Sequence, residues 1–336
     1  MQIKNCKCLL IFSIITSWLL GDINVYTHRH YDADKKLFKK FTKRTGIKVN
    51  VIKGSADQLI QRLQSEGENS PADVLLTVDA GRLVRAKKLG LLQPISSNKL
   101  RLNVPNNMRD SENYWFGLTV RARVIVYAKD RVNENELSTY EDLAKPKWKG
   151  RIVIRSSNNI YNQSLMASLI EANGTENALE WAKSVRSNMA RKPRGNDRDQ
   201  ARAVASGVAD LAVINTYYIG LLANSSNKAD REVAGKLNVY FPNQKGRGAH
   251  INVSGGGVTS SSKNKSEAIR FLEFLTENEN QRIFSESNFE YPLDYQNTNA
   301  EIFVEWGKFK ADEMNLSILG TKNVDAVKLF DLAGWE

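Results

Sequence analysis

Strand-like and helix-like segments alternate three times near the start of the chain, and this order constrains the fold more than any other feature. The strand-like segments cover 23–27, 47–52 and 71–78, and each precedes a segment whose apolar residues recur with helical spacing. Ser55 and Gln58 form a capping box before the second of these helices. Such alternation is typical of α/β proteins, so we expect a parallel sheet that is flanked by helices.

The segment Gly117–Lys129 predicts one unusually long strand. Its 13 residues, at about 3.3 Å per residue, could reach ~40 Å, which is long for a strand inside one domain. The chain has 336 residues, of which 41% are hydrophobic, so it can build more than one core. We therefore expect this strand to connect two lobes.

Three consecutive glycines, Gly255–Gly257, precede three serines at 260–262. This composition indicates a flexible turn. It does not indicate a phosphate-binding loop, because no Lys-Ser or Lys-Thr follows in the required position.

Two adjacent tyrosines, Tyr217 and Tyr218, lie where a strand-like run ends and a helix-like run begins. The apolar run 209–214 precedes them and the apolar segment 219–223 follows. In open α/β sheets, ligands bind at such junctions. Helical neighbours at i and i+1 diverge, so a purely structural role would need separate places in the core for the two rings.

Tyr31 and Tyr161 occupy equivalent places, each after a strand-like segment and near a helix start. A single tyrosine at such a place is in most proteins a packing residue. Four phenols, however, could act together as phenolates. Ionising one phenol of pKa about 10 at pH 7 costs ~4 kcal/mol, and four together cost roughly 16 kcal/mol. Only a hard, highly charged cation would supply that free energy.

The choice of cation follows from the ligand type. Zinc favours Cys and His, whereas calcium and magnesium favour carboxylates and carbonyls. Ferric ion matches oxygen anions best, as in catalase, where a tyrosine holds the haem iron. Tyr31, Tyr161, Tyr217 and Tyr218 are therefore the predicted ligands of one Fe³⁺.

Two further residues are candidates for this site. Four phenolates and Fe³⁺ sum to a charge of −1, and Arg121 on the predicted connecting strand is the candidate cation that neutralises it. His30, next to Tyr31, is a candidate additional ligand or a hydrogen-bond donor to a ligand. Each has an ordinary alternative, as a surface arginine and as a hydrogen-bonded histidine. His28 and His250 are expected to be structural.

The first 21 residues have the layout of a secretory signal peptide. Lys4 and Lys7 precede an apolar run at 9–20, which is too short to span a membrane. Removal of residues 1–21 would also remove both cysteines and lower the formal charge from +11 to +9, because two lysines are lost. We expect an exported, periplasmic protein without disulfides that does not itself span the membrane.

Several other functions are disfavoured. The positive charge suggests a nucleic-acid partner, but the basic residues are interleaved with acids and form no recognised motif. Gly-x-Ser-x-Gly and His-Glu-x-x-His are absent, and no acid–base set is identifiable, so we expect no enzyme, including a redox enzyme with tyrosine-bound iron. A binding protein for a polyamine, a sugar or an oxyanion stays open as the alternative.

The residues also resemble a known family, the periplasmic ferric-iron-binding proteins of bacterial ABC importers, in particular the cyanobacterial type. The resemblance covers nearly the whole chain after the expected signal peptide. Its most specific segments are Tyr26-Thr-His-Arg-His-Tyr31, Ala72-Asp-Val-Leu-Leu-Thr-Val-Asp-Ala-Gly-Arg82-Leu, Gly117-Leu-Thr-Val-Arg-Ala-Arg123-Val, Trp148-Lys-Gly-Arg-Ile152 and Asn215-Thr-Tyr-Tyr-Ile-Gly220.

The resemblance implies a fold and its boundaries. It implies an α/β periplasmic binding protein of the class II flytrap type, in which each of two lobes is a mixed, mainly parallel sheet flanked by helices. The N-terminal lobe would comprise 22–119 plus 250–295, and the C-terminal lobe 120–249 plus 296–336.

The resemblance also implies a function. The four tyrosines named above would hold Fe³⁺ in the cleft between the lobes, with His30 as a possible ligand and Arg121 close to the metal. A monomer would deliver the ion to an inner-membrane ABC permease and its ATPase. Relatives with fewer phenolates complete the ligand shell with an anion such as carbonate or phosphate, which four phenolates make unnecessary.

Overall fold

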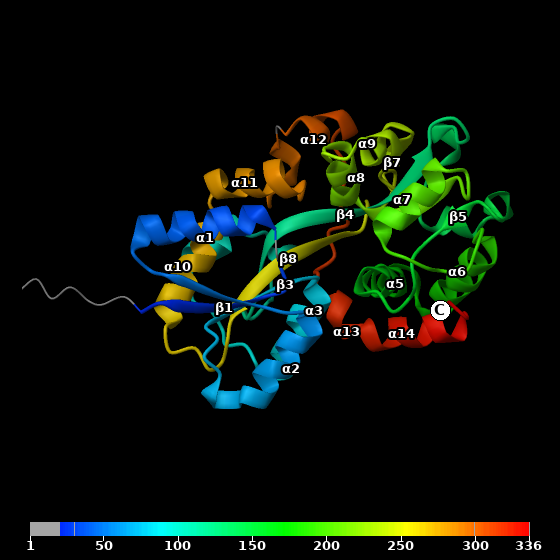
Figure 1. The fold of residues 1–336 in the computed structure, drawn as a ribbon. Coiled ribbons are helices and arrows are strands. Elements are labelled where there is room, and N and C mark those ends of the chain that lie inside the picture. The colour runs from blue at the N-terminus through cyan, green and yellow to red at the C-terminus, as the bar shows by residue number, and fades with distance from the viewer. Residues whose placement is uncertain (1–20, 30, 299, 336) are drawn as a thin grey trace, which may run out of the picture.

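The computed structural model describes residues 21–29, 31–298 and 300–335. It forms two groups of elements, one around the elements between positions 23 and 88 and the other around those between positions 152 and 240, and long strands join the two groups (Figure 1). All but the last residue of the expected signal peptide, 1–21, lies outside the described residues. None of the helices in the described part of the chain is long and apolar enough to cross a membrane.

The three alternations at the start of the chain are confirmed. Strand β1 pairs in parallel with both β2 and β3, and one helix follows each strand. The side chains of β3 are all buried, as expected for a strand inside a covered sheet. These elements are β1 (Ile23–Thr27), α1 (Asp32–Thr45), β2 (Val49–Lys53), α2 (Ala56–Glu66), β3 (Val74–Val78) and α3 (Ala80–Lys88).

The predicted long strand is confirmed as β4, Phe116–Ala128, which is buried along its whole length. Its first half pairs with β8 (Ile251–Val258), and its second half pairs with β6 (Leu211–Asn215) and β7 (Leu237–Tyr240). The sheet order is β2-β1-β3-β8-β4-β6-β5, with β7 beside β4 and β5 at Ile152–Val153. One continuous strand therefore belongs to the sheet of both groups.

The sheet is mixed, as the resemblance implies, but the expectation that it is mainly parallel is wrong. Only the pairs β1–β2, β1–β3 and β5–β6 are parallel among the named strands of the described residues, whereas β8 and β4 pair in antiparallel fashion with each other and with their other neighbours. The reason is that β8 runs in the opposite direction to β3 and β4, and β4 runs in the opposite direction to β6 and β7.

The expectation of a flexible turn at Gly255–Gly257 is also wrong. These glycines lie inside β8 and are buried. A Cβ at Gly256 would lie 2.5 Å from a methyl carbon of Leu76, and one at Gly257 would lie 2.6 Å from the carbonyl oxygen of Tyr114. The glycines therefore permit close approach of neighbouring strands and side chains, which is the usual role of glycine within a strand.

The remaining helices cover the two groups and the junction between them. Helix α13 packs against both α3 and α5, so the end of the chain contacts elements from both groups. The bounds 22–119 plus 250–295 and 120–249 plus 296–336 for the two lobes stay a prediction. The helices are α4 (Asn98–Asn103), α5 (Ile160–Asn173), α6 (Thr175–Asn188), α7 (Asp197–Ala205), α8 (Thr216–Ala223), α9 (Lys228–Gly235), α10 (Lys265–Leu275), α11 (Asn278–Asn288), α12 (Glu301–Trp306), α13 (Ile318–Thr321) and α14 (Asn323–Leu332).

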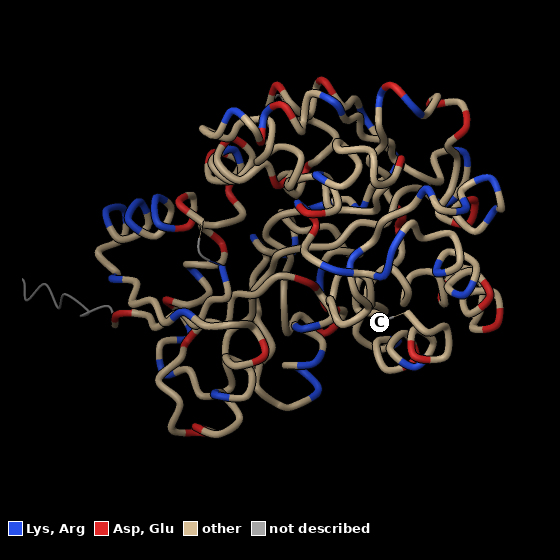
Figure 2. Tube along the Cα trace, turned by 45° about the vertical axis from the view of Figure 1, so that its right-hand side comes forward, with Lys and Arg blue, Asp and Glu red and all other residues tan. Residues whose placement is uncertain are grey.

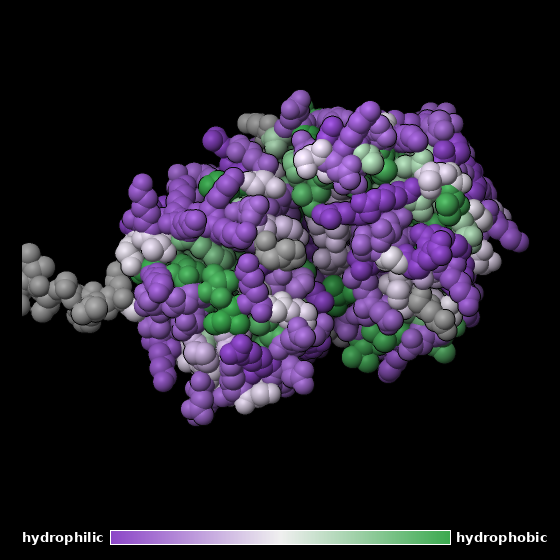
Figure 3. All heavy atoms as spheres, in the orientation of Figure 1, coloured by the Kyte–Doolittle hydropathy of each residue, from purple (hydrophilic) through white to green (hydrophobic). Residues whose placement is uncertain are grey.

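The surface is polar and carries both signs of charge. Lys and Arg occur together with Asp and Glu over both groups of elements in Figure 2. Hydrophilic side chains cover most of the face in Figure 3, with small apolar areas between them. This distribution agrees with the expectation that the basic residues form an ordinary solvated surface.

Candidate functional site

The four tyrosines lie at the N-termini of three helices, as expected. Tyr31 is the residue that precedes α1, Tyr161 is the second residue of α5, and Tyr217 and Tyr218 are the second and third residues of α8. Asn159 caps α5, and its side-chain oxygen accepts a hydrogen bond from the Tyr161 N–H. The partial positive charge of a helix N-terminus stabilises an adjacent anion by about 0.3–1 kcal/mol.

The structure brings tyrosines from α5 and α8 together. The hydroxyl oxygens of Tyr161 and Tyr217 are 3.3 Å apart. Two oxygens bound at about 2.0–2.1 Å to one small hard cation, with roughly 90–110° between the bonds, lie about 2.8–3.4 Å apart. The two hydroxyls share a hydrogen bond in the metal-free protein, and their separation also fits two ligands of one metal ion.

The rings of Tyr217 and Tyr218 do not diverge, contrary to the expectation for helical neighbours. Their centroids are 4.2 Å apart and the ring planes are inclined by 33°. The side chains are long enough for the rings to meet although their Cα–Cβ bonds point about 100° apart around the helix. The ring contact places both phenols in one cluster, in which Tyr217 is buried and Tyr218 is half-buried.

Burial and mutual charge make the metal-free phenols hard to ionise. Burial raises the pKa of Tyr217 well above its usual value, and the charges of Tyr161 and Tyr31 raise it further. Burial likewise raises the pKa of Tyr218 and of Tyr31, and the charge of Tyr161 contributes to both shifts. These groups are protonated at neutral pH without a metal, so a cation that binds as expected must displace protons.

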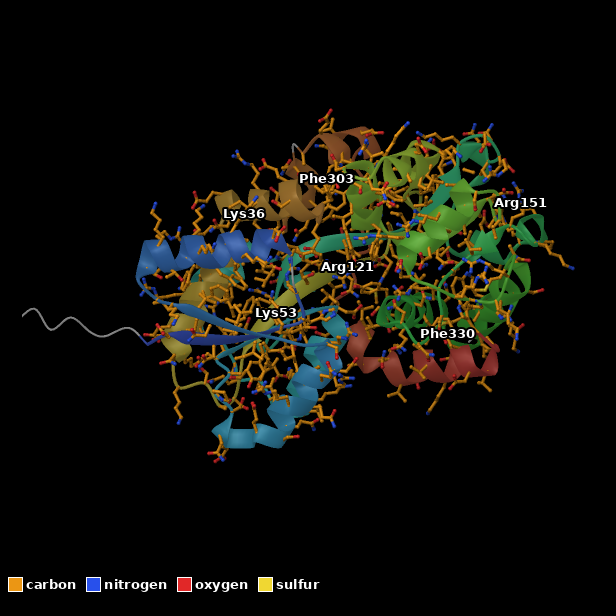
Figure 4. The ribbon with its side chains drawn as sticks, viewed as in Figure 1. Lys36, Lys53, Arg121, Arg151, Phe303 and Phe330 are labelled. Carbon is orange, nitrogen blue, oxygen red and sulfur yellow. The ribbon has the colours of Figure 1, made fainter. Side chains whose placement is uncertain are left out.

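Arg121 is not a surface arginine but lies 2% exposed behind Tyr161. The carbon of its guanidinium is 5.1 Å from the centroid of the Tyr161 ring, and its Nη2 is 3.6 Å from an oxygen of Asp79. Figure 4 places it where β4 passes between the two groups of elements. Burial lowers the pKa of Arg121, but the neighbouring negative charges, with Tyr161 and Asp79 the largest among them, together raise it overall, so the group stays cationic.

Sequence reasoning missed a second buried arginine near Tyr31. Arg29 forms ion pairs with Asp34 at 3.0 Å and with Glu290 at 2.8 Å. The carbon of its guanidinium is 5.2 Å from the centroid of the Tyr31 ring. Its position two residues before Tyr31 was the available signal, but nothing in the sequence indicated that distant Glu290 would pair with it.

A third group of charged residues lies beside the rings of Tyr161 and Tyr218. Arg123 and Arg155 both contact the buried carboxylate of Asp197, and the Arg155 contact measures 2.5 Å. Each guanidinium carbon is 5.9 Å from the centroid of the Tyr161 ring. The carbon of the exposed Arg198 guanidinium is 5.8 Å from the centroid of the Tyr218 ring. Cationic side chains therefore surround the phenol cluster.

The histidines contribute little to the described site. His30 lies outside the described residues. His28 is half-buried at the end of β1, and His250 is buried. Burial, Arg123 and Arg121 lower the pKa of His250 to about 3, so its imidazole is neutral. In residues 21–29, 31–298 and 300–335, no three His, Cys, Asp or Glu side chains gather where they could hold a metal ion.

The chain is similar to several known proteins. A model of the family described as bacterial extracellular solute-binding protein matches residues 69–311. Iron uptake protein A1 of Synechocystis is 50% identical over 94% of this chain and 88% of its own length. The major ferric iron-binding protein of Neisseria meningitidis is 31% identical over 94% of this chain and 93% of its own length.

Solved structures with the same fold agree with these relatives. The Trichodesmium protein IdiA (FutA), solved in complex with iron and citrate ligands, is 54% identical with a TM-score of 0.92, covering 94% of this chain and 100% of that one. The ferric binding protein of Campylobacter jejuni is 45% identical with a TM-score of 0.88 over the same shares.

Proposed function

The chain belongs to the bacterial extracellular solute-binding protein family, and we propose that its cargo is ferric ion, held between the two lobes by Tyr31, Tyr161, Tyr217 and Tyr218 as phenolates. The observation that carries the proposal is the 3.3 Å separation between the hydroxyls of Tyr161 and Tyr217, which suits two ligands of one small hard cation. Relatives that are named for iron uptake and for ferric iron binding support the same cargo.

Capture proceeds in two steps. Ferric ion first meets Tyr161, Tyr217 and Tyr218, which come from the neighbouring helices α5 and α8. Closure of the lobes then adds Tyr31 from the start of α1, with His30 as an additional ligand or as a donor to one. Tyr31, Tyr217 and Tyr218 give up their protons as they bind, because burial raises the pKa of each hydroxyl and keeps it neutral without metal.

The surrounding arginines balance the resulting charge. Four phenolates and Fe³⁺ carry −1. Arg121, behind Tyr161, is paired with Asp79, and Arg29, near Tyr31, is paired with two carboxylates, Asp34 and Glu290. Arg123 and Arg155 share the one carboxylate of Asp197, which leaves one positive charge beside the Tyr161 ring to offset the charge of the metal complex.

A wider role follows from the family. We propose that residues 1–21 are a cleaved signal peptide and that the protein acts as a periplasmic monomer. The closed, loaded form presents its surface to an inner-membrane ABC permease and its ATPase.

An oxyanion is the alternative cargo that one observation favours. The three guanidinium nitrogens of Arg121 are buried and make no hydrogen bond to any residue that the structure describes. An oxyanion could accept from such donors only when the lobes open, because the space beside them does not admit a water molecule in this structure. A sugar would not use the charge of Arg121, and a polyamine would be repelled by it. Calorimetry with phosphate and no iron separates the two cargoes, because a ferric-ion protein releases no comparable heat.

A visible spectrum tests the proposal directly. Metal-free protein given ferric citrate is expected to turn orange-red, because phenolates transfer charge to bound ferric ion. A protein that stays colourless and leaves all the iron in the filtrate does not have this function.

A further inference from the structure

The carboxylate of Asp79 occupies an unusual place between β3 and α3. The side chain is 0% exposed, and the backbone has φ 80° and ψ 120°. An L-residue other than glycine rarely adopts a positive φ, and it does so where the surrounding structure holds it in place. The conformation indicates that the contacts of Asp79 outweigh the backbone strain.

Those contacts come from three separate elements. The Gly81 N–H in α3 donates to Oδ1 at 2.9 Å. The Ser164 hydroxyl in α5 donates at 2.8 Å to the same oxygen, and the Asn252 side-chain amide in β8 donates to Oδ2 at 2.8 Å. One buried carboxylate thus ties α3, α5 and β8 together.

The same carboxylate faces Arg121. The Arg121 Nη2 lies 3.6 Å from Asp79 Oδ2, which is an ion pair but too long for a hydrogen bond. Arg121 on β4 is directly opposite Asn252 on β8, so both neighbours of Asp79 belong to one pair of strands. On its other side, the guanidinium faces the ring of Tyr161 at 5.1 Å.

No solvent molecule fits beside the guanidinium to replace this pairing. The adjoining space is too small for a water molecule. It is lined by Arg121, Arg123, Tyr161, Asn215, His250 and Asn252. The position of Arg121 therefore depends on the chain itself, and Asp79 is its ion-pair partner among the described residues.

We propose that Asp79 is a positioning residue for ferric-ion capture, acting through Arg121 and α5 rather than touching the metal. Ser164 is three residues after Tyr161, so both lie on one face of α5. Asp79 thus fixes the helix that carries Tyr161 and the cation behind its ring at the same time. This inference rests on the proposed function, because it concerns the geometry of the same site.

Asp79→Asn tests the proposal with little change of shape. An amide at this place would turn its NH₂ group toward the Asn252 amide or Arg121, both of which are donors, so Arg121 would lose its partner. Loss of a residue that orients a metal site typically costs about 10–100-fold in metal affinity. We expect iron transfer to excess EDTA to be at least about tenfold faster, with a shifted charge-transfer band.

Asp73→Asn is the matched control. Asp73 is also a buried carboxylate, but it lies at the opposite end of β3. It accepts from the Asn24 N–H and from the Ser262 hydroxyl, both at 2.8 Å. This variant is expected to lose thermal stability while it keeps the wild-type band and rate of iron release.

A milder variant and a double variant complete the test. Ser164→Ala removes one donor but leaves the charge, so it folds more readily and is expected to show a smaller change in the same direction. If Asp79 acts through Arg121, adding Asp79→Asn to Arg121→Gln changes iron release less than Asp79→Asn does alone.

The outcomes are distinct. Wild-type protein that binds no iron overturns the proposed function. Iron-binding wild type, with Asp79→Asn and Ser164→Ala matching its band and release rate, overturns the role of Asp79. Equal changes in Asp73→Asn and Asp79→Asn also overturn it, because they would reflect lost stability alone.

Discussion

Gly220 of α8 lies so close to Phe289 that a Cβ at position 220 would be 2.5 Å from the Cβ of Phe289. Phe289 follows directly after α11 and has a positive φ of 57°. Helix α8, whose first turn carries Tyr217 and Tyr218, therefore approaches the segment after α11 only because residue 220 has no side chain.

Gly220→Ala is expected to weaken ferric binding while all four tyrosines remain. Overpacking of this kind typically costs about 1–3 kcal/mol of stability. The affinity falls as far as this strain displaces α8 in the metal-bound state, and since 1.4 kcal/mol corresponds to a tenfold change, we expect a loss of up to roughly 150-fold. Competition with citrate measures the change. Gly235→Ala, at the end of α9, is the control, because its Cβ would meet nothing within 4 Å.

Tyr161→Phe and Tyr217→Phe are each expected to reduce the charge-transfer band and the ferric affinity by more than tenfold, because each removes one phenolate from the metal. Tyr291→Phe is the control. The Tyr291 phenol is also buried, and its hydroxyl has no hydrogen-bond partner among the described residues. A Tyr161→Phe or Tyr217→Phe protein with wild-type colour and affinity would contradict the assignment of that ligand.

Ferric binding is expected to weaken as the pH falls. Burial and neighbouring phenols raise the pKa of Tyr31, Tyr217 and Tyr218, so these groups are protonated before the metal arrives. Release of up to four protons lowers the affinity by as much as ~4 decades per pH unit. Calorimetry in buffers of different ionisation enthalpy counts the protons, and a count near zero would contradict ligation by phenolates.

The metal-free protein is expected to lose stability below pH 6.5 through His250. Burial lowers the pKa of His250 to about 3. The unfolded chain then binds a proton that the folded protein does not, so the stabilisation is present above the unfolded pKa and declines as the pH falls toward 3. The slope is up to about 1.4 kcal/mol per pH unit. Urea unfolding at pH 7 and pH 5 should show a smaller loss for His250→Gln than for wild type.

The sequence predicted those features that leave a local signal. Apolar spacing located β1 to β3 and their helices, and thirteen consecutive residues suited to a strand located β4. The placement of Tyr161 and Tyr217 at helix starts was also visible, because the strand-to-helix boundaries could be read from the sequence.

Features that depend on distant pairing could not be predicted. Arg29 and Glu290 are 261 positions apart, and no local sequence pattern around either residue predicts that they pair. The direction of β8 is set by its pairing with β3 and β4, which are distant in the sequence. The glycines of β8 have the composition of a turn, and only this pairing shows that they lie in a strand. The hydrogen bond between Asp79 and Ser164 likewise joins elements 85 positions apart.

The continuity of β4 limits how the two halves of the molecule can move. Its partner changes from β8 to β6 between Ala122 and Arg123, in the middle of one unbroken backbone. Neither half can slide along the other without breaking that ladder, so opening is confined to bending and twisting over a few peptide units. Arg121 lies in β4 one residue before this change of partner, so bending there would move Arg121 less than the residues at the far ends of the two halves.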